Sequence, residues 1–234
     1  MDKLFKNKYK EPYNHIIINN FLEEKFIEKI IKYFPDINNF NDTKRNEQII
    51  NNNSTRKAFY LDNQEDFQKI KNKDIFIKLY KHFNNKEFLN NIFNVFNKEL
   101  PKEYHLQCQL IYDTKGYNIL PHCDNFKNKR HKYLTLLLYL PDDNIEEYGT
   151  EMYKEIKDGN ISYLDKEINK KRNFTIVKKV PFKKNILFAF IPEYNKTWHG
   201  VSKIEKNITR RSIQIFVKEK KSINYKIESS LFDH

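Results

Sequence analysis

The sequence contains few of the residues that mark secreted or membrane-bound chains. Only two cysteines occur among 234 residues, Cys108 and Cys123, which are too few for a disulfide framework. A reducing cytoplasm is the simpler interpretation. The first residues lack an apolar run of signal-peptide length, and no stretch approaches a membrane span. These absences predict a cytoplasmic protein with no membrane segment.

Aromatic residues, in contrast, are abundant. Nineteen Phe and fifteen Tyr can fill a hydrophobic core, and 234 residues suit one large domain. Lys and Arg outnumber Asp and Glu by 43 to 31, a net charge of +12, but the basic residues are scattered along the chain. We interpret most of this charge as solvated surface, which permits a nucleic-acid partner without favouring one.

The first hundred residues carry mostly helical patterns. Apolar residues recur at helical spacing from about residue 22 to 34, and again from 64 to 98 with an interruption near Asn84 and Asn85. Short strands are expected at 13–20 and 56–61. We therefore predict a largely helical N-terminal part over residues 1–100.

After Pro101 the pattern changes to short strands without intervening helices. Strand formers dominate residues 105–112, 133–140, 151–153, 174–180, 186–191 and 212–217, whereas residues 154–172 are expected to form a loop. The apolar run at 133–140 is typical of a strand covered on both faces. We predict a single α+β domain over 1–234, with a mainly β core at 101–218 and a C-terminal tail at 219–234. The core is expected to be an antiparallel barrel or a jelly roll with the helices packed on one sheet.

Two segments whose histidines are 77 residues apart carry side chains of metal-ligand type. Residues 120–125 read LPHCDN, and residues 197–201 read TWHGV. Side chains alternate across a strand, so His122 and Asp124 project to one side and Cys123 to the other. His199, from a distant strand, would complete a set of two histidines and one carboxylate. Such a set with open positions favours Fe(II), whereas zinc more often takes a closed His or Cys tetrahedron.

Eleven residues after the second histidine, the chain reads Arg210-Arg211-Ser212. A guanidinium binds a carboxylate through two parallel hydrogen bonds, and a hydroxyl two residues further on can support the same group. Arg210 shares a strand face with Ser212, so we prefer it as the anchor of an organic acid and keep Arg211 as the alternative. Tyr112 and Tyr139 could each donate a hydrogen bond to that acid, or serve as core tyrosines.

These residues resemble the Fe(II)- and 2-oxoglutarate-dependent dioxygenases, specifically the prolyl-4-hydroxylase-like branch. Residues 112–125 look like that branch's tyrosine, glycine-containing turn and His-x-Asp segment. Residues 148–152 are similar to its Gly-Gly-Glu-Leu turn, with Thr150 in place of the second glycine. Residues 198–201 look like the loop that bears the distal histidine, and Arg210-Arg211-Ser212 is similar to its Arg-x-Ser. The resemblance covers roughly residues 100–218.

The resemblance implies a double-stranded β-helix, a distorted jelly roll. It assigns Fe(II) binding and catalysis to His122, Asp124 and His199. It assigns binding of the co-substrate 2-oxoglutarate to Arg210, Ser212, Tyr112 and Tyr139. It leaves ascorbate open as an additional cofactor.

The implied reaction couples oxidative decarboxylation of 2-oxoglutarate by O2 to hydroxylation of an unactivated C–H bond, with release of succinate and CO2. The prime substrate is expected to be a peptidyl or free amino-acid side chain, and candidate pocket residues are Arg56, Asn125 and Trp198. Two alternatives stay open: nucleic-acid demethylation by the same chemistry, and a non-catalytic binding domain on the same fold. The oligomeric state is open as well.

Overall fold

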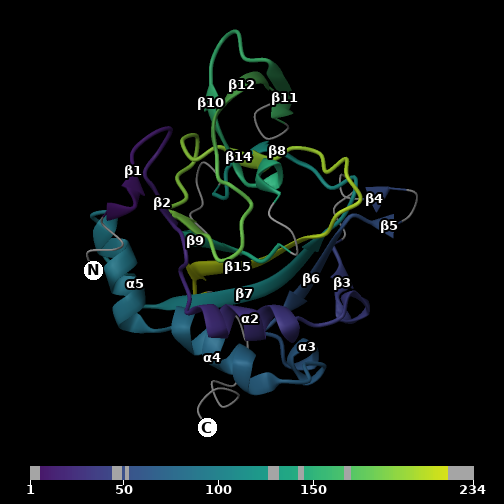
Figure 1. Cartoon of the computed structure of the whole chain (residues 1–234). Coiled ribbons are helices and arrows are strands. Elements are labelled where there is room, and N and C mark those ends of the chain that lie inside the picture. Colours follow the sequence, from purple (N-terminus) through teal and green to yellow (C-terminus); the bar gives the residue numbers. More distant parts are fainter. Residues whose placement is uncertain are drawn as a thin grey trace.

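Two antiparallel β-sheets face each other, and helices cover the outer face of the larger one (Figure 1). The computed structural model describes residues 6–43, 49–50, 53–125, 132–141, 145–165 and 170–220. The expectation of a mainly β chain with helices packed on one sheet is confirmed.

The larger sheet has eight strands and draws on the whole chain. Its order is β1 (Lys8–Tyr9), β2 (His15–Ile18), β13 (Leu187–Phe190), β9 (Lys132–Tyr139), β15 (Arg210–Glu219), β7 (Tyr104–Asp113), β6 (Arg56–Tyr60) and β3 (Asn41–Asp42). The strands expected at 13–20 and 56–61 are therefore present as β2 and β6. The first hundred residues supply strands of this sheet as well as helices, and a division of the chain at residue 100 stays a prediction.

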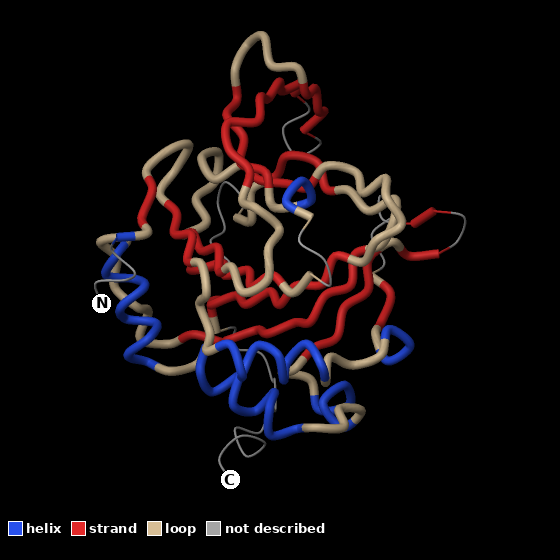
Figure 2. Tube along the Cα trace, in the orientation of Figure 1, coloured by secondary structure: helices blue, strands red, loops and turns tan. Residues whose placement is uncertain are grey.

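The smaller sheet has five strands and lies opposite the middle of the larger one (Figures 1 and 2). Its order is β11 (Ile161–Asp165), β12 (Lys170–Lys179), β10 (Glu151–Glu155), β14 (His199–Val201) and β8 (Ile119–His122). A separate two-stranded ribbon is formed by β4 (Ile49–Ile50) and β5 (Asn53–Ser54).

The helices follow the predicted apolar spacing. They are α2 (Glu24–Lys32), α3 (Gln64–Gln68), α4 (Lys73–Phe83) and α5 (Lys86–Val95), with short 3-10 turns η1 (Ile37–Asn39) and η3 (Glu146–Tyr148). The interruption expected near Asn84 and Asn85 is confirmed, because the Asn85 side chain accepts a hydrogen bond from the Phe88 amide and caps α5. Among the described residues, no helix has the length and apolar character needed to cross a membrane.

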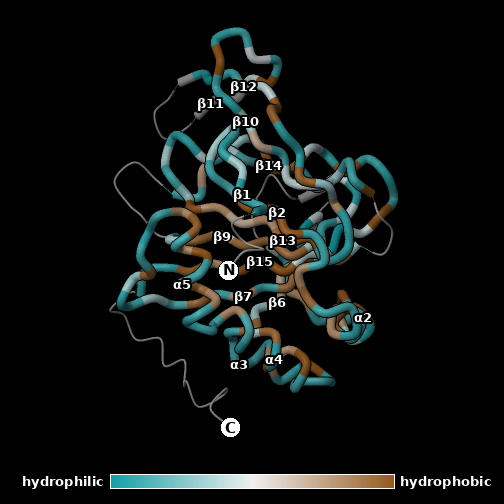
Figure 3. The backbone as a smooth tube through the Cα atoms, turned by 60° about the vertical axis from the view of Figure 1, so that its left-hand side comes forward, coloured by the Kyte–Doolittle hydropathy of each residue, from teal (hydrophilic) through white to brown (hydrophobic). Residues whose placement is uncertain are grey.

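The core lies mainly between the helices and the larger sheet. In β7, Leu106, Cys108 and Leu110 face this core, while Gln107 and Gln109 face the space between the two sheets. The apolar strand β9 is covered on both faces, as its sequence predicts, because alternate residues contribute to two separate apolar clusters. Hydrophobic residues accordingly concentrate on the central strands in Figure 3. The face of the larger sheet that lacks helices is left to form a polar cavity.

One part of the sequence-based assignment is wrong. Residues 154–172 were expected to form a loop, but β11 and β12 pair across this region and project as a hairpin from the smaller sheet (Figure 1). This hairpin is rich in lysine and leaves Ile176 and Val177 exposed, so its strands lack the apolar alternation of a half-buried strand. The tail expected at 219–234 lies outside the described residues from position 221 onward.

Candidate metal centre

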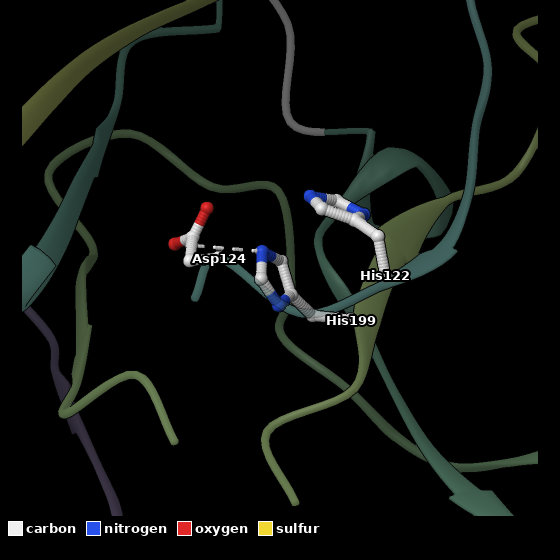
Figure 4. Close-up of side chains that lie close together, drawn as sticks. All are labelled: His122, Asp124 and His199. Atoms are coloured by element: carbon white, nitrogen blue, oxygen red, sulfur yellow. Dashed lines mark ion pairs between the residues drawn. The ribbon is translucent and has the colours of Figure 1, made fainter. Parts of the chain in front are cut away.

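Three ligand-type side chains converge on the inner side of the smaller sheet. His122 is the last residue of β8, and His199 is the first residue of β14; the two lie opposite each other in the antiparallel pair. Asp124 follows two residues after His122, and Figure 4 shows its carboxylate facing the His199 ring. One ligand atom from each side chain lies within 4.8 Å of the others. Two strands that are distant in sequence thus bring together a two-histidine, one-carboxylate set.

The alternation predicted for residues 122–124 is present. Cys123 points to the opposite side and packs against an apolar cluster of Tyr153, Phe174 and Trp198. Trp198 was a candidate for the substrate pocket, and that prediction is wrong because its ring packs against Phe174 in this cluster and does not line the cavity.

Both histidines are oriented by backbone carbonyl groups. His122 Nδ1 lies 3.0 Å from the Leu120 carbonyl oxygen, and His199 Nδ1 lies 2.9 Å from the Thr197 carbonyl oxygen. If each Nδ1 donates its proton to that carbonyl, each Nε2 keeps its lone pair for a metal. Such contacts fix the tautomer and ring orientation of a metal-binding histidine.

Asp124 is held by two side chains of strand β9, which belongs to the larger sheet. Lys132 Nζ lies 2.5 Å from Oδ1, and the Thr135 hydroxyl donates to Oδ2 at 2.8 Å. Burial alone would raise the pKa of Asp124, but Lys132, His199 and His122 outweigh it and hold the pKa below its ordinary value. The carboxylate is therefore ionised and oriented toward the two imidazoles.

The two imidazoles are neutral at physiological pH. Burial, together with the neighbouring His199, lowers the pKa of His122 to about 3. Burial also lowers the pKa of His199, despite the attraction of Asp124. Two neutral imidazoles and one carboxylate, with no fourth protein ligand in the described residues, fit Fe(II) with open positions.

A cavity of about 470 Å³ lies in front of this cluster, between the two sheets. It extends from the three ligands across the inner face of the larger sheet to Arg56 and Arg210. Both arginines are almost entirely buried, with 8% and 1% of their surface exposed. The cavity thus joins a candidate metal site to a buried cationic end.

The choice between the two arginines at the start of β15 is decided by the sheet face. Arg210 lines the cavity and donates from Nε to the Tyr148 carbonyl oxygen at 2.8 Å. Arg211 lies on the opposite face of β15, where its guanidinium carbon sits 5.4 Å from the centre of the Phe34 ring. Arg210 is therefore the arginine that can reach a ligand in the cavity.

Ser212 and Tyr139 are neighbours of Arg210. They lie opposite each other in the pair of β15 and β9, and both are fully buried. The Tyr139 hydroxyl donates to Thr150 Oγ1 at 2.6 Å, and its ring centre is 5.5 Å from the Arg210 guanidinium carbon. Burial raises the pKa of Tyr139, so the phenol stays protonated and able to donate. Ser212 Oγ is buried without a hydrogen-bond partner.

Tyr112 does not reach the cavity, so its predicted role is wrong. Its ring packs against Phe34 and Phe40 on the helix side of β7, with ring centres 5.4 and 4.8 Å away. The register of β7 turns the next residue, Asp113, toward Arg210 instead. Tyr112 is a core tyrosine, which was the alternative stated for it.

The third pocket candidate, Asn125, has a structural role. Its amide group donates to the Lys132 and Pro192 carbonyl oxygens, both at 2.9 Å, and it is almost fully buried. Sequence reasoning missed Asp113, Lys132 and Thr135. The parity of Thr135 with Tyr139, and of Asp113 with Gln107 and Gln109, was a usable signal, whereas Lys132 lies beside an irregularity in the pairing of β9 with β15.

The sequence comparison identifies a family model in the strand-rich part of the chain. Residues 106–218 match the model of the 2OG-Fe(II) oxygenase superfamily. A comparison with curated proteins finds no match.

Solved structures with a similar fold include several prolyl hydroxylases. A prolyl hydroxylase from Trichoplax adhaerens, solved with a hypoxia inducible factor oxygen degradation domain peptide, is 16% identical, with 93% of this chain and 88% of that chain covered at a TM-score of 0.56. A Pseudomonas putida prolyl-4-hydroxylase is 12% identical, with 93% and 98% covered at a TM-score of 0.56. The viral collagen prolyl hydroxylase of Paramecium Bursaria Chlorella virus-1, solved with 2OG, is 14% identical, with 88% and 96% covered at a TM-score of 0.52. At these identities the likeness establishes a shared fold.

Proposed function

Residues 106–218 belong to the 2OG-Fe(II) oxygenase superfamily, so the protein is a 2-oxoglutarate-dependent dioxygenase, and we propose that it hydroxylates an amino-acid side chain. The target is an unactivated C–H bond of a peptidyl or free amino acid, and the co-products are succinate and CO2. The observation that carries this proposal is the cavity that joins the cluster of His122, Asp124 and His199 to Arg210.

The three clustered side chains are proposed as the iron ligands. When bound, Fe(II) supplies the oxidative chemistry with 2-oxoglutarate and O2. His122 and His199 bind through Nε2, since their Nδ1 atoms face backbone carbonyls. Asp124 binds as a carboxylate whose orientation is fixed by Lys132 and Thr135. The protein's own contribution is to hold these atoms in one geometry inside a buried site.

The buried end of the cavity is proposed to bind 2-oxoglutarate. Arg210 is the anchor for the distal carboxylate, because a guanidinium binds a carboxylate bidentately and this one is buried at the cavity wall. The unpartnered Ser212 hydroxyl, two residues further along the strand, is proposed as a further donor, and so is the Tyr139 phenol, which would exchange its bond to Thr150 Oγ1 for one to the ligand. Tyr112 has no part in this site.

The prime substrate would lie over the remaining floor of the cavity. This floor carries three amide side chains, Gln107, Gln109 and Gln214, on adjacent strands. An amide group both donates and accepts hydrogen bonds, so the floor suits the peptide or carboxamide groups of an amino-acid substrate. The Trichoplax adhaerens structure with a similar fold was solved with a peptide, which also supports this class of substrate.

We also infer that the two sheets form the double-stranded β-helix, and that residues 1–234 make a single domain. The pairing of β8 with β14, and of β9 with β13 and β15, supports this arrangement. It sets the ligand-bearing strands opposite the strands that carry the acid-binding residues.

The proposal is tested by 2-oxoglutarate turnover. Purified protein with Fe(II), O2 and 2-oxoglutarate is expected to release succinate, and the release should rise in the presence of the correct substrate. His199→Ala should abolish it, because one of the three ligands is lost. His105→Ala is a matched control, since His105 contacts Asp62 near the start of β7 and does not line the cavity.

The substrate class is tested by mass spectrometry of peptide and metabolite mixtures. The expected product is heavier than its precursor by one oxygen atom and carries it on an amino-acid side chain. Products demethylated on nucleic-acid bases, with no hydroxylated amino acid, would contradict the proposed substrate class. Absence of both metal binding and succinate release in the wild-type protein would contradict the proposal as a whole.

A further inference from the structure

A row of three charged residues crosses the larger sheet at the buried end of the cavity. Asp113 ends β7, and its register partners are Arg56 on β6 and Arg210 on β15. Neighbouring strands lie about 4.8 Å apart, so the two arginine Cα atoms are on the order of 10 Å from each other. Long side chains on the same face can converge across that distance.

The single carboxylate of this row is shared by both guanidinium groups. Arg210 Nη1 lies 2.6 Å from Asp113 Oδ2, and Arg56 Nε lies 3.3 Å from Asp113 Oδ1. Asp113 is fully buried. In the described part of the chain, no other carboxylate forms an ion pair with either arginine, so two buried positive charges face one negative charge.

Arg56 is fixed in place but incompletely bonded. Its Nη1 donates to the Tyr117 hydroxyl, and its guanidinium carbon lies 5.0 Å from the Tyr117 ring centre. Its Nη2 is buried and has no hydrogen-bond partner. A buried, unbonded guanidinium nitrogen is costly unless a ligand completes it. Because Arg56 lines the same cavity as Arg210 and the metal cluster, that ligand can be an anion in the cavity.

We propose that Arg56 and Arg210 together bind the distal carboxylate of the 2-oxo acid, while Asp113 orients both guanidinium groups. This inference rests on the proposed function and adds a second carboxylate-binding residue from β6, a strand that lies outside the segment matching the family model. The unmatched positive charge of the row then has its counter-charge in the ligand. Arg56 is thereby assigned to the co-substrate rather than to the prime substrate.

The test compares the binding of two acids to the wild-type protein and to the Arg56→Gln variant. Binding of 2-oxoglutarate and of 2-oxopentanoate, which has a methyl group where 2-oxoglutarate has its distal carboxylate, is measured by calorimetry with Mn(II) in place of Fe(II). Arg56→Gln is expected to weaken 2-oxoglutarate about 10- to 100-fold, the range for a lost hydrogen bond to a charged group. The same variant should leave 2-oxopentanoate nearly unchanged, because the interaction partner is missing from that ligand.

Arg211→Gln is the matched control. Arg211 is buried to the same extent as Arg56, with 8% exposed, but lies on the helix side of the sheet. The Arg211→Gln variant should bind both acids as the wild type does. If Arg56→Gln does not fold, Arg56→Lys is measured in the same cycle, because it keeps the charge and loses the fork that binds a carboxylate bidentately.

The outcomes distinguish a failure of the role proposed for Arg56 from a failure of the proposed function. Equal weakening of both acids by the Arg56 variant, or no weakening of either, would overturn the role of Arg56 while wild-type binding of 2-oxoglutarate leaves the proposed function standing. Failure of the wild-type protein to bind 2-oxoglutarate in the presence of Mn(II) would overturn the proposed function, and the role of Arg56 with it.

Discussion

Replacing Thr135 with valine removes one hydroxyl group from beside the Asp124 carboxylate and changes the side-chain volume very little. Thr135 is 2% exposed, and its hydroxyl donates to Asp124 Oδ2 at 2.8 Å. The other oxygen, Oδ1, keeps its contact with Lys132 at 2.5 Å. The variant therefore releases one side of the carboxylate without removing its counter-charge.

The size of the effect follows from the charge and burial of this hydrogen bond. A hydrogen bond to a charged group contributes about 1.5–3 kcal/mol, and its loss leaves Asp124 able to rotate away from the two imidazoles. We expect the Thr135→Val variant to bind divalent metal about 10- to 100-fold more weakly, the usual range for residues that orient a metal ligand.

The assay is a titration of metal-free protein with Mn(II) or Co(II), with a chelator as competitor. Thr135→Ser is the control, because it keeps the hydroxyl and loses a methyl group from the packed strand. It should bind metal as the wild type does, while its melting temperature falls. A Thr135→Val variant that folds and binds metal as tightly as the wild type would refute the view that this hydroxyl orients the ligand.

Two further predictions concern pH and backbone packing. Burial first, and Lys178 in addition, lower the pKa of His15 to about 4, so folding favours the neutral imidazole that lies between the Tyr13 carbonyl and the Lys178 ammonium. Since the unfolded pKa is about 6.5, this stabilisation is present above pH 6.5 and falls as the pH drops toward 4. Between pH 7 and pH 5 the wild-type protein should therefore lose about 2 kcal/mol more stability than the His15→Gln variant, measured by urea unfolding. An equal loss in both proteins would contradict this. Gly200→Ala would bring a Cβ atom to 2.4 Å from the Ile119 carbonyl oxygen, so β14 must separate from β8, and the same metal titration should show weaker binding; unchanged affinity would contradict the close approach of the two strands.

Local patterns were enough to predict that His122 and Asp124 lie on one side of their segment. His122 and Asp124 share a side because side chains alternate over two residues, and this holds wherever the strand lies in the fold. The preference for Arg210 over Arg211 used the same parity, with Ser212 as the reference. Each of these inferences needed only a relation between residues close together in the sequence.

Inferences that required the register between strands were less successful. Tyr112 stands at the position of the tyrosine in the family-like segment, but its ring packs against Phe34 and Phe40, and Asp113 is the residue that contacts Arg210. The alternation of β7 puts Tyr112 on the same face as Leu106, Cys108 and Leu110, whereas the meeting of Asp113 with Arg210 depends on the register between β7 and β15. The pairing of Arg56 with Asp113 joins positions 57 residues apart and depends on the same tertiary register.

The position of β8 at the edge of its sheet has a consequence for the metal-free protein. Among the described strands, β8 pairs only with β14, yet it carries His122 and leads directly into Asp124. An edge strand of four residues has few hydrogen bonds to hold it, so we expect it to open at a lower free energy than the central strands. A metal bound between His199 and this strand would act as a cross-link that closes the edge. Removal of the metal should then increase amide hydrogen exchange in β8 well before the whole chain unfolds, which makes local exchange at this edge a reporter of metal occupancy.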